Sequence, residues 1–312
     1  MKKKWKNIFG SLITIILTIL LLKYIGYRLN PAWSDDGIQV IKAFHKLEKD
    51  SCDVIVYGSS HAWKGFDTRE LEKEYSLSAY NYACNWQAIN TTLLFLQDSL
   101  QTQSPSVVCI DTYCCNDVLH DTKLTGQIYY CRAIPSSKYK MDFLKQCFRD
   151  DVENWASYYL PIMMFHENWK AVTVENYLVR SQEELIQNRG YYSSKEVFSC
   201  EPVDEQCEQY QLSIEARQVL DSIVECCEKK GIKVLFYTCP YYGENNYSDA
   251  LSEYCKDNGC EYLNLFEKVE EMGFNWETDL QDEGHLNDSG AKKVADYLGG
   301  IIIKNYITEV NK

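Results

Sequence analysis

Two short polar stretches, far apart in a chain of 312 residues, hold the residue types that acyl transfer requires. The first is "GSSH" at 58–61, directly after the β-branched run "VIVY", and the second is "DEGH" at 282–285. A serine hydroxyl is a weak nucleophile until a base takes its proton, and that base needs an acid to orient it. Ser60, His285 and Asp282 are the candidates for nucleophile, base and acid.

Each stretch also has a purely structural interpretation. Gly58 and the two serines are typical of an ordinary strand-to-helix turn with polar capping. The Asp-x-x-His spacing places Asp282 beside the imidazole of His285 in a turn, which would fix its tautomer. The same acids can merely decorate a loop and cap the next helix. The combination of the two stretches favours chemistry over either structural interpretation.

The elements that must position these residues are indicated by three apolar runs without strict alternation. They lie at 52–58, 106–113 and 232–240. Such runs are typical of strands covered on both faces of a parallel sheet. Helical patterns separate or follow them at 67–75, 88–100, 214–231 and 288–306. Alternating strands and helices predict an α/β doubly wound domain of the flavodoxin-like kind, with its active site at the carboxyl ends of the strands.

The chain as a whole divides into an anchor, a stalk and one main domain. Residues 1–29 are the predicted anchor, 30–50 a stalk with a helix, and 51–308 the main domain. The aromatic and charged stretch from about 118 to 210 interrupts the strand and helix alternation, and we interpret it as a helical insertion or lid.

The first 29 residues predict a membrane-spanning signal anchor. Four lysines precede an apolar run from about Ile8 to Leu22 that extends to Tyr27, about 20 residues and enough to cross a bilayer. A cleaved signal peptide is the alternative, but no small-residue cleavage site follows the run. The positive-inside rule leaves the lysines in the cytoplasm and the rest of the chain outside. We therefore expect a single-pass protein of the cell membrane.

Charge and cysteine usage exclude other classes. The chain after residue 23 carries 27 basic against 45 acidic residues, which is a poor surface for nucleic acid. Fourteen cysteines are scattered without any C-x-x-C, so four-ligand zinc spacing is absent and no metal is expected. Several cysteines, such as Cys109 and Cys239, lie in apolar contexts typical of small buried side chains. The pairing of cysteines in disulfides stays open.

Together, the "GSSH" turn and the "DEGHLN" loop resemble the SGNH/GDSL hydrolase superfamily, over about residues 50–310. By position, the G-D-S-L signature of that superfamily falls on Gly58, Ser59, Ser60 and His61. The resemblance implies that Ser60 is the nucleophile, with Asp282 and His285 as its acid and base. The serine at 59 and the polar residue at 61 are similar to membrane-anchored members.

The resemblance also implies an oxyanion hole. Its first donor is the backbone amide of Ser60, and its glycine is expected near Asn85–Trp86, where no glycine stands. A backbone N–H needs no particular side chain, and the Asn85 amide is an alternative donor. The G-x-N-D block of the superfamily falls on "CCND", which offers Asn116. A plain turn asparagine is the other interpretation of Asn116.

The remaining histidines are weaker candidates. His61 adjoins the serine and is expected to form a pocket wall or a substrate contact, with a role as the base as the alternative. His166 and Trp169 match a His-x-x-Trp segment of anchored relatives, which implies a lid contact, but such residues more often form a packed pair. No function is predicted for His45 or His120.

The sequence thus predicts a membrane-anchored serine esterase or O-acyltransferase without cofactors. The resemblance implies acylated glycans or other envelope polymers as substrates, and a multispanning membrane O-acyltransferase as a possible partner. A non-catalytic binding or assembly component of a polysaccharide-modifying complex is the alternative. This sequence matches the glycine and asparagine blocks of the superfamily only loosely, which supports that alternative. The complete set of Ser60, Asp282 and His285 opposes it.

Overall fold

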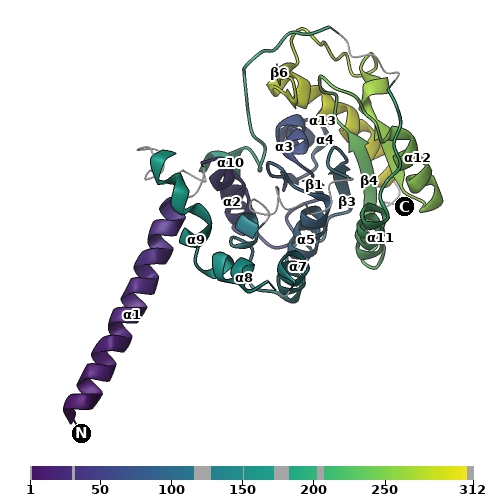
Figure 1. The fold of residues 1–312 in the computed structure, drawn as a ribbon. Helices are drawn as coiled ribbons and strands as arrows, with labels where there is room; N and C mark the ends of the chain where they lie inside the picture. The colour runs from purple at the N-terminus through teal and green to yellow at the C-terminus, as the bar shows by residue number, and fades with distance from the viewer. Residues whose placement is uncertain are drawn as a thin grey trace.

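The computed structural model describes six stretches of the chain. They are residues 2–29, 32–115, 128–149, 151–171, 183–201 and 207–307. The first is one long helix, α1 (Lys2–Arg28), which extends away from the rest of the protein (Figure 1). Its Trp5–Arg28 segment of 24 residues is the one helix in the described stretches that is long and apolar enough to cross a membrane.

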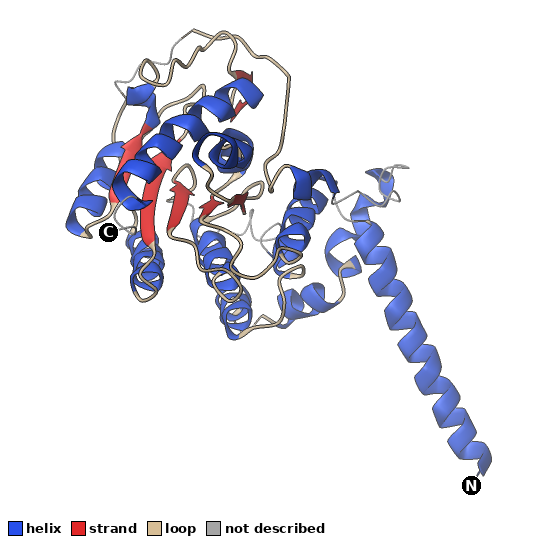
Figure 2. Ribbon diagram, turned by 180° about the vertical axis from the view of Figure 1, so that it is seen from behind, coloured by secondary structure: helices blue, strands red, loops and turns tan. Residues whose placement is uncertain are grey.

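Five strands form one parallel sheet in the order β2-β1-β3-β4-β5, with helices on both faces (Figure 2). The strands are β1 (Val54–Tyr57), β2 (Ala79–Asn81), β3 (Val107–Asp111), β4 (Lys233–Thr238) and β5 (Glu261–Asn264). This confirms the predicted α/β doubly wound fold, and β1, β3 and β4 lie in the three apolar runs. The chain leaves β1 toward one edge and β3 toward the other, so the strand order reverses between them. In such sheets ligands bind at that point.

Two groups of helices sandwich the sheet. On one face α3, α4 and α13 pack together, and on the other face α5 packs against α11, with α7 outside it and α12 beside β5. Their bounds are α3 (Ser60–Gly65), α4 (Thr68–Tyr75), α5 (Ile89–Ser99), α7 (Lys138–Phe148), α11 (Ile214–Glu228), α12 (Ser248–Asp257) and α13 (Asp288–Ile302). The helices predicted at 67–75, 88–100, 214–231 and 288–306 are therefore present. Short elements complete this part: η3 (Leu265–Lys268), β6 (Leu280–Asp282), β7 (His285–Leu286) and the π-helical turn η4 (Ile303–Ile307).

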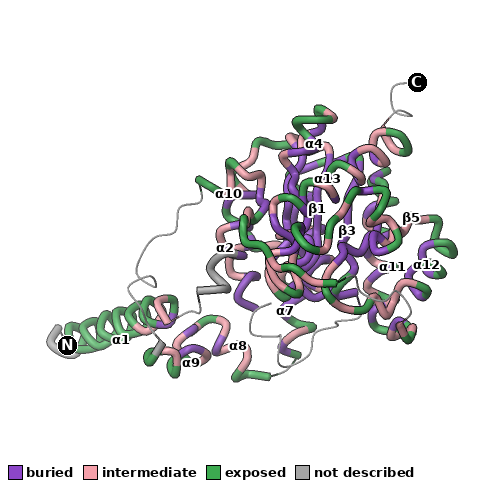
Figure 3. The backbone as a smooth tube through the Cα atoms, turned by 90° about the horizontal axis from the view of Figure 1, so that it is seen from above, coloured by how far each residue is buried: buried purple, intermediate pink, exposed green. Residues whose placement is uncertain are grey.

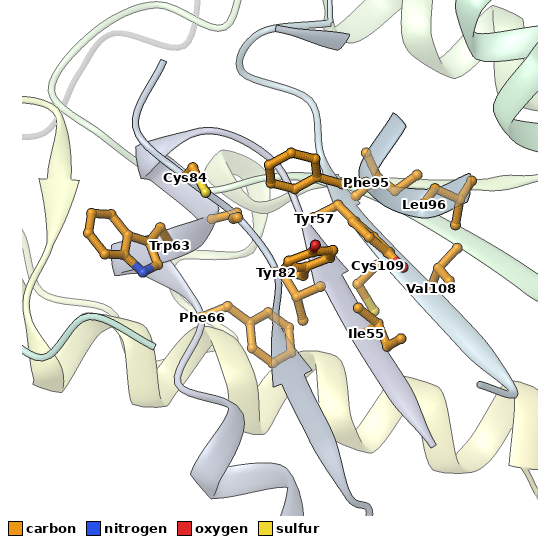
Figure 4. Close-up of a cluster of buried hydrophobic side chains, with 14 of the residues drawn as sticks. Ile55, Tyr57, Trp63, Phe66, Tyr82, Cys84, Phe95, Leu96, Val108 and Cys109 are labelled. Atoms are coloured by element: carbon orange, nitrogen blue, oxygen red, sulfur yellow. The ribbon is translucent and has the colours of Figure 1, made fainter. Parts of the chain in front are cut away.

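The core around β1 is rich in aromatic rings (Figure 4). Tyr82 is stacked between Phe44 and Phe95, at ring-centroid distances of 4.2 and 4.7 Å. Phe44 belongs to α2 (Ala32–Phe44), which buries Val40 and Ile41 as well. The helix predicted within 30–50 is therefore present, and its buried side chains from residue 38 onward are part of the core.

In the described part of the predicted insertion, four short helices follow α7 on the side of the domain that faces α1 (Figures 1 and 3). They are α8 (Val152–Tyr159), α9 (Ile162–Phe165), the 3-10 helix η1 (His166–Ala171) and α10 (Glu183–Gln187). The segment 189–201 then runs back across the domain. Phe198 donates its N–H to the Leu280 carbonyl at 2.8 Å, and Asp288 accepts from the Tyr191 and Ser193 hydroxyls at 2.9 and 2.8 Å. We call residues 189–201 the strap, because they tie the insertion to β6 and α13.

All fourteen cysteines lie in the described residues, and none of them is disulfide-bonded. Cys109 on β3 and Cys239 after β4 are buried in the core, as their apolar sequence contexts indicated. Burial raises the pKa of both thiols. Such cysteines pack as small apolar side chains.

Candidate active site

Ser60 is held at the sheet's carboxyl edge by a turn that only glycine can make. Gly58 follows β1 with φ +146°, and a Cβ there would lie 2.8 Å from the Ala62 Cβ and 2.9 Å from the Asp111 Cβ. The side chain of Ser59 caps α3 by accepting the His61 N–H at 3.3 Å. Ser60 is therefore the first residue of α3, beside the point where the strand order reverses. Ser60 is half-buried as a residue, whereas Ser59 is buried.

The structure brings Ser60, His285 and Asp282 into one hydrogen-bonded line. The His285 Nε2 lies 2.8 Å from the Ser60 Oγ, although the two residues are 225 positions apart in the sequence. The His285 Nδ1 lies 2.8 and 3.0 Å from the two Asp282 carboxylate oxygens. This is the geometry of a nucleophile, a general base and an orienting acid. The Asp-x-x-His spacing works because β6 ends at Asp282 and β7 begins at His285, so a tight turn sets the side chains together.

The Asp282 carboxylate is fixed by two further donors. The Gln281 carboxamide donates to its Oδ2 at 2.9 Å, and the Gly284 N–H donates to its Oδ1 at 2.9 Å. Partial burial alone would raise the pKa of Asp282, but these bonds and the neighbouring His285 outweigh it, so the pKa is lowered. The carboxylate is therefore ionised at neutral pH and stabilises the His285 tautomer with its proton on Nδ1.

His285 itself is neutral at pH 7. Desolvation lowers the pKa of its imidazole, the positive charge of Lys64 lowers it further, and Asp282 opposes both. Neutral imidazole leaves Nε2 with a lone pair aimed at the Ser60 hydroxyl. The arrangement can accept a proton from the serine without first having to lose one.

His61 forms a wall of the same site. It is buried, and its ring stacks on Tyr113 at a centroid distance of 3.4 Å and meets Tyr241 edge-on at 4.9 Å. Its ring centroid lies 5.3 Å from that of His285. Desolvation, followed by the charge of His285, holds the pKa of His61 well below its usual value. Nothing orients it as a base, because no carboxylate among the described residues bonds to its ring.

The predicted oxyanion residues lie partly within the described chain. The segment after β2 runs beside the nucleophile turn, since Cys84 donates its N–H to the Gly58 carbonyl. Among the described residues the N–H groups of Ser60 and Asn85, and the Asn85 carboxamide, make no hydrogen bond. Trp86 has φ +56°, a left-handed conformation that glycine adopts freely and tryptophan rarely. The left-handed backbone at Trp86 thus lies where the resemblance to the SGNH/GDSL superfamily leads us to expect a glycine. Asn116 lies outside the described residues, as does His120.

His166 and Trp169 are not part of this site. Both lie in η1 and are exposed, and neither makes a hydrogen bond or ring contact with the Ser60, Asp282 and His285 side chains. They also do not form the packed pair that was the structural alternative. The imidazole of His166 faces the Met163 carbonyl at 3.3 Å, whereas the Trp169 ring lies 5.7 Å from the Lys170 ammonium. His45 pairs with the Asp98 carboxylate at 3.0 Å.

The sequence reasoning missed several residues of the site. Asp111 ends β3 beside Gly58, where burial raises its pKa to about 7, and its carboxylate accepts N–H groups of Tyr113 and Cys239, both at 3.1 Å. It thereby holds the loops that carry Tyr113 and Tyr241. An aspartate that ends an apolar run is a visible signal for such a position. Gln281, adjacent to Asp282, offered no signal, because its role depends on the turn between β6 and β7.

Metal ligands do not gather in the described stretches: they hold no group of three or more histidine, cysteine or acidic side chains suited to an ion.

No protein-family model matches the chain, and no curated protein matches it either. Among solved structures, one with a similar arrangement is that of a protein from Bacteroides fragilis described as a "putative acylhydrolase". The alignment covers 88% of this chain and 99% of the other, with 11% sequence identity and a TM-score of 0.41.

Proposed function

We propose that this protein is a membrane-anchored, serine-dependent acyl ester hydrolase or O-acyltransferase of the SGNH type. One observation carries the proposal: the Ser60 hydroxyl lies 2.8 Å from the Nε2 of an imidazole whose Nδ1 is bonded to Asp282. A binding module would have no use for all three groups in that order. The "GSSH" and "DEGH" motifs and their resemblance to the SGNH superfamily support the same conclusion.

The proposed first step forms an acyl-enzyme. His285 Nε2 takes the Ser60 proton while the Ser60 Oγ bonds to the ester carbonyl carbon, and the carbonyl π electrons move to oxygen. When the carbonyl re-forms, the bond to the alcohol oxygen breaks, and the His285 imidazolium gives its proton to that leaving oxygen. Asp282 holds the imidazole in one tautomer and stabilises its transient charge.

Backbone groups beside the nucleophile turn are the proposed oxyanion donors. The Ser60 and Asn85 N–H groups and the Asn85 carboxamide are free of partners in the described chain, so they can bond to the developing oxyanion. Removal of one such donor costs about 3–4 kcal/mol of transition-state stabilisation. Asn116 is a further proposed donor, from the loop after β3.

The second step distinguishes hydrolysis from transfer. A water or a sugar hydroxyl gives its proton to His285 Nε2 while its oxygen bonds to the acyl carbon. The bond from the acyl carbon to the Ser60 Oγ then breaks, and the His285 imidazolium returns the proton to that oxygen. We propose glycan or envelope-polymer esters as substrates, because an anchor with lysines inside sets the domain at the outer face of the membrane. A multispanning membrane O-acyltransferase is the proposed partner when the reaction is transfer.

The test is labelling of the full-length protein in detergent with a fluorophosphonate probe, which reports an activated serine. We expect one labelled site, mapped by peptide mass spectrometry to Ser60 and not to Ser59. Labelling should vanish in Ser60→Ala and His285→Ala. Ser222→Ala is the matched control, because within the described chain its hydroxyl bonds only to the Gln218 carbonyl on α11, and this variant should label like the wild type.

Absence of labelling in a folded wild-type protein would instead favour the binding or assembly role. Labelling that persists in His285→Ala would show that another group activates the serine. His61 would be the first candidate for that group, because its ring is close to that of His285.

A further inference from the structure

The outer end of α1 is packed directly against the insertion. A Cβ at Gly26 would lie 2.8 Å from the Pro161 carbonyl carbon and would collide with the Ile162 nitrogen, so the absence of a side chain is what lets the two backbones meet. The Asn168 carboxamide donates to the Leu29 carbonyl at 3.1 Å. The last turn of α1 therefore meets the start of α9, and the residue after α1 is bonded to η1.

The same short segment exposes large apolar side chains. Tyr159, Met163 and Trp169 are 56%, 42% and 65% exposed, on α8, α9 and η1 respectively. Figure 3 shows α8 and α9 beside the exposed α1 and away from the buried sheet. Isolated exposed apolar residues are ordinary, but a group of them that continues an exposed apolar helix indicates an interaction surface.

The depth of this group follows from α1. The 24 residues of Trp5–Arg28 span about 36 Å at 1.5 Å per residue, slightly more than the bilayer's ~30 Å hydrocarbon core. The Gly26 turn of α1 therefore lies at the outer boundary of the core. Tyr24, Tyr27 and Arg28 have the residue types of that boundary, and the Arg28 guanidinium lies 5.4 Å from the Tyr24 ring.

We propose that Tyr159, Met163 and Trp169 form a lipid-contacting surface that lies in the headgroup region of the bilayer crossed by α1. This inference rests on the membrane anchoring in the proposed function. We call these three residues the interfacial surface. Tryptophan and tyrosine are enriched at that depth, because the ring is apolar and its N–H or O–H can remain in water.

The charges of the segment indicate which lipids it binds. Glu153 and Glu167 oppose the single Lys170 within 152–170, so the segment carries no excess of positive charge. We therefore expect no higher affinity of this segment for anionic lipid than for zwitterionic lipid, since electrostatic attraction requires clustered lysine or arginine. We therefore expect contact through apolar burial, which a zwitterionic phosphatidylcholine bilayer supports at any ordinary salt concentration.

The experiment is fluorescence quenching of the full-length protein in nanodiscs of phosphatidylcholine with and without brominated acyl chains. The Trp169 component is the difference between the wild type and Trp169→Phe, which should keep the wild-type melting temperature. We expect the Trp169 fluorescence to lose about half or more of its intensity when the bromines lie near the headgroup, because interfacial side chains reach ~5–10 Å into the boundary. Bromines near the chain ends should quench it less.

Two other tryptophans give matched controls. Trp5, in the first turn of α1, should be quenched if that helix is inserted. Trp276 precedes β6, which lies on the far side of the domain from α1 (Figure 1), and should be unaffected. Quenching of Trp5 without Trp169 would overturn the interfacial surface and leave the anchor intact. Quenching of neither would overturn the anchor as well, whereas labelling of Ser60 tests the chemistry separately.

Discussion

The nucleophile turn and the contact between α1 and α9 both depend on a glycine, but for different reasons. At Gly58 the glycine is needed for its positive φ and for the close approach of Ala62 and Asp111. At Gly26 the backbone is helical, and the glycine is needed only because α9 lies where a side chain would be. Gly58 therefore orients the Ser60 hydroxyl, whereas Gly26 allows α9 to pack against α1.

The contacts around the two glycines differ accordingly. The Ser60 site is joined by directional hydrogen bonds, and each of them fixes one proton or one tautomer. The α1–α9 contact depends on close packing of the two backbones at Gly26, and the neighbouring η1 adds the Asn168 bond to the Leu29 carbonyl. Loss of a bond in the site should therefore abolish chemistry without unfolding the protein. Loss of the close packing between α1 and α9 should lower the stability of the protein or shift α9 relative to α1, without altering the reaction at Ser60.

The largest effect is expected from Asp282→Asn. The amide keeps the shape but favours the wrong tautomer of His285, so kcat for ester hydrolysis should fall about 10⁴-fold. The measurement is turnover of a small chromogenic ester by the full-length protein in detergent. Glu283→Gln is the matched control, one residue away in the same turn, since its side chain makes no bond to the triad in the described chain. An equal loss in both variants would count against the proposed role of Asp282.

His61→Phe sharpens the contrast between the two histidines of the site. A phenyl ring can still stack on Tyr113, so we expect kcat to fall less than about tenfold, which is below the contribution of a true general base. The same chromogenic ester provides the measurement. A loss comparable to that of His285→Ala would instead identify His61 as the base.

Lys64→Gln should move the pH profile without removing activity. The positive charge of Lys64 lowers the pKa of His285, and its loss raises that pKa. Because the neutral imidazole is the active form, activity rises with pH through this pKa. The acidic limb of kcat/KM should therefore shift to higher pH in the variant. A limb that shifts to lower pH, or does not move, would show that His285 does not control it.

Gly26→Leu should have the smallest effect on chemistry and a clear effect on the fold. The leucine collides with the backbone of Pro161 and Ile162, so we expect a loss of about 1–3 kcal/mol in stability, or displacement of α9. Turnover of a small soluble ester should stay within about twofold, since kcat reports the triad alone. Thermal unfolding and limited proteolysis measure the change.

Gly10→Leu is the control for that substitution, because a Cβ at Gly10 has no heavy atom within 4 Å. It adds the same leucine to the same helix without a collision. If both variants behave alike, the effect belongs to α1 itself and not to its contact with α9.

The sequence predicts an element well when the residues that stabilise it are close to one another in the chain, and poorly when they are distant. The three buried runs predicted β1, β3 and β4 because every residue of β1 and β3 is buried. β2 and β5 were missed: β2 has only three residues, and β5 is only half-buried along its length. Short or half-exposed strands acquire their structure from neighbours that the local pattern does not contain.

The same distinction holds for the site. Ser60, Asp282 and His285 were identifiable because their residue types are needed for one reaction and two of them are close in sequence. Asp111 had a visible signal at the end of an apolar run, but its partners on the loops were not predictable, and Gln281 and Tyr241 had no signal because each acts through loops that the sheet brings together. The apolar face of α2 was visible in the sequence, but its place in the core depends on Tyr82 and Phe95.

The position of Asp288 has a consequence for biosynthesis. Its carboxylate receives the Tyr191 and Ser193 hydroxyls of the strap, and it lies three residues after His285. Synthesis proceeds from α1 onward, so a nascent chain carries Ser60 long before it carries the base that would activate it. The hydrogen bonds between the strap and Asp288 also cannot form until the segment that carries Asp288 has been synthesised. In a chain whose translation is incomplete, Ser60 would thus lack its proposed base, and α1 would be made before the Ser60, His285 and Asp282 line can form.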